Sequence, residues 1–162
     1  MTGEKPLHSA YISIGSNIEP DRHIREAIRL LRTEGKILAF SSVWETEAVG
    51  SGGPNFLNAA VAFETPFLRQ ELKERLLHVI ENRLGRVRSA DKNAPRTIDL
   101  DVIIFDGQVV DNELWGRLYI ARPFAELLPD LVNPITGQTL LVTADALHQH
   151  GYAVIYPGLI DI

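Results

Sequence analysis

Arginine and aspartate side chains gather in one segment of the chain, GRVRSADKNAPRTIDLD. Arg86 and Arg88 alternate near its start, and Arg96 follows a polar loop. Asp99 and Asp101 alternate at its end, where a strand would point both carboxylates to one face, about 6–7 Å apart along the chain. Mg²⁺ suits such a pair because it prefers a few carboxylates with water and phosphate. Guanidinium groups suit phosphate because they stay charged and present a planar fork of donors. The segment therefore indicates phosphoryl transfer on a nucleotide.

Each half of this pattern also has an ordinary explanation. Alternating acids often form the solvated face of a sheet, and paired arginines are often solvated surface. The occurrence of both in one short segment gives the ligand-site interpretation equal standing with these alternatives.

The composition indicates one globular domain over residues 1–162. A hydrophobic fraction of 45% and a charged fraction of 23% are ordinary for such a protein. The net charge of −5 argues against a general nucleic-acid binder. Positive charge is concentrated instead in the arginine-rich segment, which suits a small anionic ligand. Because the chain has no cysteine, disulfides and thiolate metal sites are excluded.

No targeting signal is apparent in the sequence. No apolar run is long enough to span a membrane, and the first residues lack a hydrophobic signal core. We therefore expect a cytoplasmic protein with small-molecule substrates and neither a membrane nor a nucleic-acid partner. A monomer is the default expectation.

Hydrophobic periodicity predicts the elements that would position the charged segment. Pro20 begins a helix whose apolar residues recur at helical spacing, and Gly35 ends it. Gly85 caps a second helix. Asp106 and Gly107 predict a tight hairpin. The predicted strands lie at 10–14, 37–46, 56–65 and 99–105, and the predicted helices at 20–34 and 68–84.

This order predicts an α+β, ferredoxin-like βαββαβ fold, an antiparallel sheet with both helices on one face and a C-terminal extension. The first and fourth strands would lie side by side, with Asp99 and Asp101 facing a cleft. In the extension, we expect a short helix or turn at 123–131 and a helix at 143–150 with Thr143 as its cap.

Two polar features have alternative interpretations. Asn58 lies on an otherwise apolar strand, so it either forms a structural hydrogen bond or recognises the amide-like edge of a ligand. The Gly15-Ser16-Asn17 sequence is either a tight turn or a nest for phosphate.

Several motifs occur in a specific order along the chain. They are IGSN at 14–17, SVWET at 42–46, PNFLNAAV at 54–61, GRVR at 85–88 and APRTIDLD at 94–101. The last resembles the GPRTLDLD signature of 6-hydroxymethyl-7,8-dihydropterin pyrophosphokinase of folate biosynthesis. The resemblance extends from about residue 10 to 110 and returns at 123–129. By it, the chain is identified as a divergent member of that family.

The resemblance implies that the pterin hydroxymethyl oxygen attacks the β-phosphorus of ATP, accepting pyrophosphate and releasing AMP. Two Mg²⁺ ions would bind to Asp99 and Asp101, and Arg86 and Arg96 would stabilise the transferred group. The implied ATP-binding residues are His78, Glu81, Arg86, Arg88, Arg96, Val102 and Arg117. The implied pterin-binding residues are Thr46, Glu47, Val49, Phe56, Asn58, Asp99 and Tyr119, of which Phe56 and Tyr119 would stack on the ring.

Three segments depart from the family pattern. Asn93 replaces a loop tryptophan, Glu47 and Ala48 replace a proline-rich loop start, and residues 112–117 are too few for the Pro-His motif that contacts ATP. Loss of a charge-assisted contact would weaken ATP binding by about 1.5–3 kcal/mol. The alternatives are therefore a paralogue acting on another pterin-like acceptor, or a catalytically weak nucleotide- or pterin-binding module on the same fold.

Overall fold

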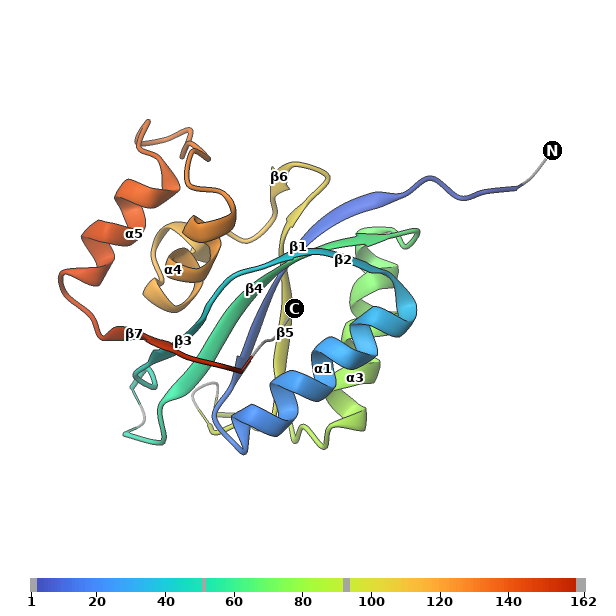
Figure 1. Ribbon diagram of the computed structural model, residues 1–162, viewed down its shortest axis with the longest axis horizontal. Helices are drawn as coiled ribbons and strands as arrows, with labels where there is room; N and C mark the ends of the chain where they lie inside the picture. Colours follow the sequence, from blue (N-terminus) through green and yellow to red (C-terminus); the bar gives the residue numbers. More distant parts are fainter. Residues whose placement is uncertain (1–2, 51, 92–93, 160–162) are drawn as a thin grey trace.

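A computed structural model describes residues 3–50, 52–91 and 94–159. The fold is mixed α+β with an antiparallel sheet (Figure 1). The strands are β1 (His8–Ser16), β2 (Lys36–Phe40), β3 (Val43–Thr46), β4 (Phe56–Thr65), β5 (Asp99–Phe105), β6 (Gln108–Val109) and β7 (Ala153–Tyr156). The helical elements are α1 (Pro20–Glu34), α2 (Arg69–Glu71), the π-helical turn η1 (Leu72–Leu77), α3 (His78–Arg83), the 3₁₀ turn η2 (Asn112–Trp115), α4 (Leu118–Leu127) and α5 (Leu140–His148).

The strands follow the order β6-β5-β1-β4-β3-β7, and β2 also pairs with β4. β1 lies between β4 and β5, so the first and fourth predicted strands are neighbours, as expected. Its register places Ser13 opposite Asp101 and Gly15 opposite Asp99. The Asp106–Gly107 hairpin prediction is confirmed, because both residues have positive φ and connect β5 to β6.

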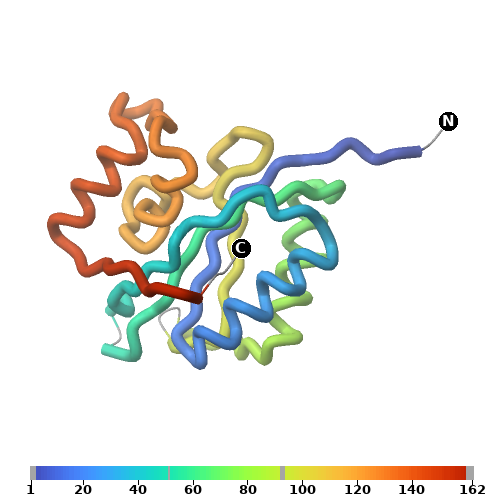
Figure 2. Tube along the Cα trace, viewed as in Figure 1, coloured from blue at the N-terminus to red at the C-terminus, as the bar shows by residue number. Residues whose placement is uncertain are grey.

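Helices cover both faces of the sheet (Figures 1 and 2). The larger core lies between the sheet and the α1 and α2-η1-α3 helices, and a second core lies under α4 and α5. Alternation along β4 follows this division: Leu57, Ala59, Val61 and Phe63 enter the larger core, and Ala60 enters the second. The prediction of helices on one face is therefore correct for α1 and α3, whereas the C-terminal helices take the other face. Within the described ranges, no helix has the length and apolar character needed to cross a membrane.

The strand predicted at 37–46 is wrong as one element, because it is interrupted between β2 and β3. Ser41 donates its backbone N–H to Ala60 O, and its hydroxyl accepts the Ala60 N–H at 2.8 Å. The next N–H, of Ser42, donates to the Glu126 carboxylate at 2.9 Å. Side chains thus replace part of the regular strand pairing, and both β2 and β3 still pair with β4.

Two further corrections concern the C-terminal extension. The last helix begins one turn earlier than predicted, since Thr139, and not Thr143, accepts the Val142 N–H as its cap. The four-residue strand β7 was not predicted at all. It pairs with β3, so its partner lies more than a hundred positions away in the sequence.

Gly35 ends α1 where the chain passes close beside β4. A Cβ atom at this position would overlap the buried Phe63 ring and lie 2.7 Å from Glu64 O. We expect Gly35→Ala to lower the free energy of unfolding by about 1–3 kcal/mol, because the core cannot accommodate the added methyl group. Urea unfolding would measure the difference. Gly116→Ala is the matched control, since nothing lies within 4 Å of its Cβ position. Equal losses in both variants would contradict the packing explanation.

Candidate active site

Three neighbouring strands contribute residues to one cavity of about 310 Å³. Ser13 and Gly15 come from β1, Asn58 from β4, and Asp99 and Asp101 from β5. Because side chains alternate along a strand, each pair with a spacing of two points to the same side. The predicted shared face of the two carboxylates is thus confirmed, and it is the face that also carries α4.

Loops complete the rim of this cavity. Thr46 ends β3, and Glu47 and Val49 follow it in the next loop. Arg117 and Tyr119 enter from the start of α4. The cavity is therefore bounded by segments that lie far apart in the sequence.

The cavity brings together ten of the residues singled out from the sequence. They are Thr46, Glu47, Val49, Phe56, Asn58, Arg96, Asp99, Asp101, Arg117 and Tyr119. Five others do not line it. Val102 packs against the larger core, and His78 lies half-buried on α3. Glu81, Arg86 and Arg88 form an ion-pair network with Asp99 beside the cavity. Asn93 falls outside the described residues.

Four lining residues were missed by the sequence reasoning, namely Ser13, Asp111, Glu113 and Ile120, and Gly15 was considered only as part of the turn after the first strand. Strand alternation in β1 was a usable signal for Ser13 and Gly15. No comparable signal existed for the two acids, because they reach the cavity only through the path of the chain after β6. Asp111 also has a structural role, accepting the Glu113 N–H as the cap of η2.

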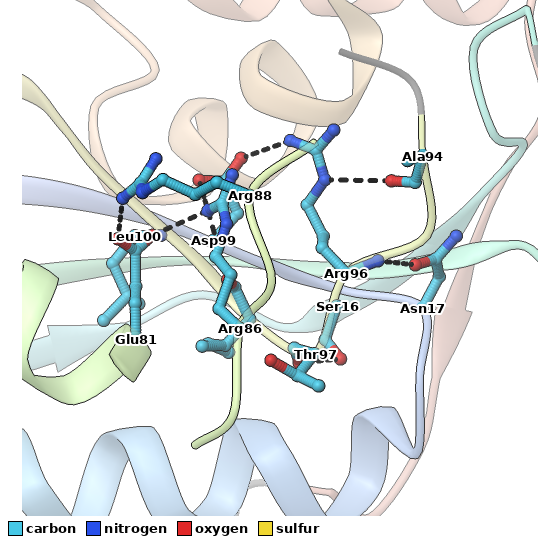
Figure 3. A network of polar contacts seen from close by, with 11 residues as sticks. Ser16, Asn17, Glu81, Arg86, Arg88, Ala94, Arg96, Thr97, Asp99 and Leu100 are labelled. Carbon is cyan, nitrogen blue, oxygen red and sulfur yellow. Dashed lines mark hydrogen bonds and ion pairs between the residues drawn. The ribbon is translucent and has the colours of Figure 1, made fainter. Parts of the chain in front are cut away.

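Asp99 is held by two arginines (Figure 3). Its Oδ1 lies 2.5 Å from Arg86 Nη1, and its Oδ2 lies 3.0 Å from Arg96 Nη1. Burial by itself would raise the pKa of Asp99, but the two guanidinium groups outweigh it and lower the pKa below its ordinary value. Asp99 is therefore ionised at neutral pH.

Asp101 has a different environment from its neighbour. Its side chain opens into the cavity and makes no hydrogen bond or ion pair with any described residue. Desolvation by the surrounding protein, together with the negative charges of Asp99 and Glu81, raises the pKa of Asp101 to about 7. The site thus presents one paired and one unpaired carboxylate side by side.

The turn after β1 anchors the loop that carries Arg96 (Figure 3). Asn17 Oδ1 accepts the Arg96 N–H at 2.8 Å, and the Asn17 N–H donates to Arg96 O. Ser16 Oγ donates to Thr97 O at 2.5 Å, and Asn17 Nδ2 donates to Pro54 O at 3.2 Å. Since its polar groups bond to protein, this turn supports the tight-turn interpretation over the phosphate nest.

Asn58 is buried in the wall of the cavity. Its Nδ2 donates to Thr46 Oγ1 at 2.7 Å, which supplies the structural partner expected for such a residue. A Cβ atom at Gly15 would lie 2.9 Å from Asn58 Oδ1, so the glycine leaves room for this amide. Beside it, the Arg96 guanidinium lies 5.9 Å from the centre of the Phe56 ring. The cavity therefore combines a fixed amide, an aromatic face and a cation.

No group of three or more histidines, aspartates or glutamates within the described ranges could hold a metal ion. The donor set at Asp99 and Asp101 is two carboxylates. This set fits Mg²⁺, which takes one or two carboxylates and completes its shell with phosphate and water.

A protein-family model supplies the deciding comparison. The model for 7,8-dihydro-6-hydroxymethylpterin-pyrophosphokinase (HPPK) matches residues 11–129. The chain belongs to the HPPK family. The match spans β1 to the end of α4 and so includes every residue that lines the cavity.

Relatives of the HPPK family extend this comparison. The chain is 36% identical to 2-amino-4-hydroxy-6-hydroxymethyldihydropteridine pyrophosphokinase of Bacillus subtilis over 79% of its own length and 83% of the relative. It is 35% identical to folic acid synthesis protein fol1 of Schizosaccharomyces pombe, covering 88% of this chain and 21% of that protein. These identities agree with a divergent member of the family.

Solved structures show the same fold. The HPPK-DHPS protein of Plasmodium falciparum with pterin and p-hydroxybenzoate matches at a TM-score of 0.68 and 12% identity, over 93% of this chain. The chain spans 43% of the length of that structure.

Proposed function

We propose that this chain transfers pyrophosphate from ATP to the hydroxymethyl group of 6-hydroxymethyl-7,8-dihydropterin, releasing AMP, in folate biosynthesis. Membership of the HPPK family and the relatives named as this pyrophosphokinase support the activity. The observation that carries the assignment of the site is one cavity that joins aromatic and amide groups to a carboxylate pair. The ferredoxin-like description of the core belongs to the same proposal, supported by the strand order β5-β1-β4-β3.

The pterin would occupy the part of the cavity next to β4. Phe56 and Tyr119 offer aromatic faces for a flat heterocycle, and such stacking contributes about 0.5–1.5 kcal/mol per pair beyond burial. Asn58 and Thr46 offer hydrogen-bonding groups to its polar edge, and their mutual hydrogen bond keeps the amide oriented before substrate arrives. Glu47 and Val49 would close the rim.

Asp99 and Asp101 would hold two Mg²⁺ ions, and Asp99 would also contact the pterin hydroxyl. The metal ions supply neutralisation of the charge on the polyphosphate oxygens. Both acids line the cavity from alternate positions of β5, so their side chains lie on the same face of the sheet. Asp101 fits this role because no arginine or lysine among the described residues forms an ion pair with its carboxylate.

The arginines would bind the polyphosphate. Arg88 is 57% exposed beside the site, and Arg96 and Arg117 line the cavity. Arg86 has a buried Nε–H without a hydrogen-bond partner among the described residues, and an unpaired buried donor is costly. A phosphate oxygen would satisfy it. Because guanidinium groups stay charged, this assignment does not depend on pH near neutrality.

The test is acceptor-dependent release of AMP. Purified protein with MgCl₂, ATP and 6-hydroxymethyl-7,8-dihydropterin should form AMP and the pterin pyrophosphate in equal amounts. The matched control acceptor is 6-methyl-7,8-dihydropterin, which lacks the hydroxyl and should give no AMP. Absence of AMP with the hydroxymethyl compound would refute the proposal, and AMP with a different hydroxylated pterin alone would favour the paralogue alternative.

A further inference from the structure

Glu81 is the most enclosed carboxylate near the site, with a side chain only 2% exposed (Figure 3). Its Oε2 accepts a hydrogen bond from Arg86 Nη1 at 2.7 Å and from the Leu100 N–H at 3.0 Å. Its Oε1 accepts a hydrogen bond from Arg88 Nη2 at 2.9 Å. One carboxylate thus joins both arginines to the start of strand β5.

These contacts leave Glu81 badly placed for direct contact with ATP. It does not line the cavity, and its side chain is almost completely buried, whereas the Asp99 side chain is 26% exposed and lines the cavity. A polyphosphate would also repel it. Burial raises the pKa of Glu81, so the structure holds this charge at a cost that the hydrogen bonds from Leu100 and Arg86 reduce. We therefore expect Glu81 to act on ligand binding through the arginines that it contacts.

The wide turn η1 explains how Glu81 comes to face inward. In a regular α-helix at about 100° per residue, Glu81 would point roughly opposite to Leu72, nine positions earlier. A π turn bonds residue i to i+5, which brings Leu72 and Leu77 onto the same side, and both are fully buried. Glu81 follows Leu77 by four residues and therefore shares the buried side. The continuous α-helix predicted at 68–84 is wrong at this point.

Arg86 connects Glu81 to the reacting groups. Its Nη1 contacts Glu81 Oε2, Asp99 Oδ1 and Ile98 O, so the guanidinium is fixed between the two carboxylates. Arg88 depends on Glu81 more simply, because that carboxylate is its ion-pair partner while more than half of its side chain is exposed. Movement of Glu81 would remove one of the three contacts of Arg86 Nη1 and the ion-pair partner of Arg88.

We infer that Glu81 is a positioning residue, which orients Arg86 and Arg88 for the ATP polyphosphate without touching it. The inference rests on the proposed function and replaces the direct ATP contact expected from the family resemblance. In Glu81→Gln, an amide oxygen in the place of Oε2 still accepts from the Leu100 N–H and Arg86, but the amide N–H₂ in the place of Oε1 faces the Arg88 guanidinium donor and displaces it. The π-helical turn η1 is needed for this role, because it places the Glu81 carboxylate on the buried side of the helix.

The direction in which Glu81→Gln changes ATP affinity distinguishes a positioning role from a simple effect of charge. Removing a negative charge beside a polyanion should tighten ATP binding if charge alone matters. Loss of arginine positioning should weaken it. We expect Glu81→Gln to raise the Kd for MgATP by about 10–100-fold, the range found when a residue that orients metal ligands is removed. Isothermal titration calorimetry without pterin measures this Kd and requires no turnover.

A double-mutant cycle separates positioning from direct contact. In an Arg86→Ala, Arg88→Ala background, Glu81→Gln should change the Kd by less than about threefold, because the groups through which it acts are gone. Glu74→Gln, on the exposed side of the same helical segment, is the matched control and should bind as wild type. Glu81→Asp keeps the negative charge but moves it away from the arginines, because the side chain is one methylene shorter. It should therefore also weaken ATP binding. This variant replaces Glu81→Gln in the test if the Gln variant does not fold.

Each possible result of these measurements either supports or overturns the positioning role of Glu81. Weaker binding by Glu81→Gln with a non-additive cycle supports the inference. Unchanged or tighter binding by a folded Glu81→Gln, or a fully additive cycle, overturns it. If the wild-type protein binds no MgATP, the proposed function fails instead, and the inference fails with it.

Discussion

Asp101→Asn is expected to abolish turnover and, at the same time, to stabilise the metal-free protein. Turnover should fall by at least about 10³-fold, since a lost metal ligand removes several kcal/mol of transition-state stabilisation. Stability should rise because the substitution removes a carboxylate that has no ion-pair partner among the described residues and is repelled by the charges of Asp99 and Glu81. A residue kept for function at the expense of stability is a common feature of active sites.

The stabilisation should depend on pH in a defined direction. Because the pKa of Asp101 is raised to about 7 in the folded protein, the contribution of this group to the stability of the wild type falls as the pH rises from about 4 to 7. The asparagine variant lacks this loss. Its advantage should therefore grow over that window and be complete above pH 7. Thermal unfolding without Mg²⁺ at pH 5 and at pH 8 would measure it.

Asp99→Asn is the matched comparison, and its effect on stability should be opposite to that of Asp101→Asn. It should also lose turnover, but it should destabilise the protein, because Arg86 and Arg96 would lose their carboxylate partner. Turnover above about a tenth of the wild-type value in either folded variant would show that the two-carboxylate metal site is wrong. Equal stability changes in the two variants would contradict the distinct environments of these acids.

Arg96→Ala is expected to reduce kcat by about 10³–10⁵-fold, the range associated with a positioned arginine in phosphoryl transfer. The backbone of Arg96 is fixed by Asn17, and its guanidinium bonds to Asp99 beside the Phe56 ring. The side chain thus lies where both proposed substrates meet. Steady-state AMP release with each substrate varied in turn would separate the effect on kcat from that on KM.

Arg96→Lys tests whether charge alone is sufficient. We expect it to recover little activity, because an ammonium group cannot present the planar fork that bonds to a carboxylate and to phosphate. Arg83→Ala provides the control, since Arg83 is exposed and does not line the cavity. Near-wild-type kcat in the lysine variant would contradict a geometric role for Arg96.

Much of the fold was accessible from the sequence because it depends on local patterns. The boundaries of α1 follow from Pro20, the apolar spacing after it and Gly35. The two faces of β4 follow from strict alternation, and Gly85 ends its helix with positive φ as predicted. In the same way, the spacing of Asp99 and Asp101 placed them on one face. Each of these features involves residues that are neighbours in the chain.

Other features depended on contacts that no local pattern reports. The interruption at Ser41 arises from bonds to Ala60 and Glu126, and β7 forms only because β3 offers an edge. The segment that forms the π turn has its apolar residues at the spacing of an ordinary α-helix. The sequence therefore could not distinguish a π turn from an α-helical turn at this point.

The sequence by itself determined the composition of the site, its carboxylates, its arginines and their family resemblance. Only the tertiary structure decided how the charges are paired: Asp99 with Arg86 and Arg96, Glu81 with Arg86 and Arg88, and Asp101 with no described residue. The physical reason is that side-chain direction follows local periodicity, whereas ion pairing and burial depend on the distances between segments that folding brings together.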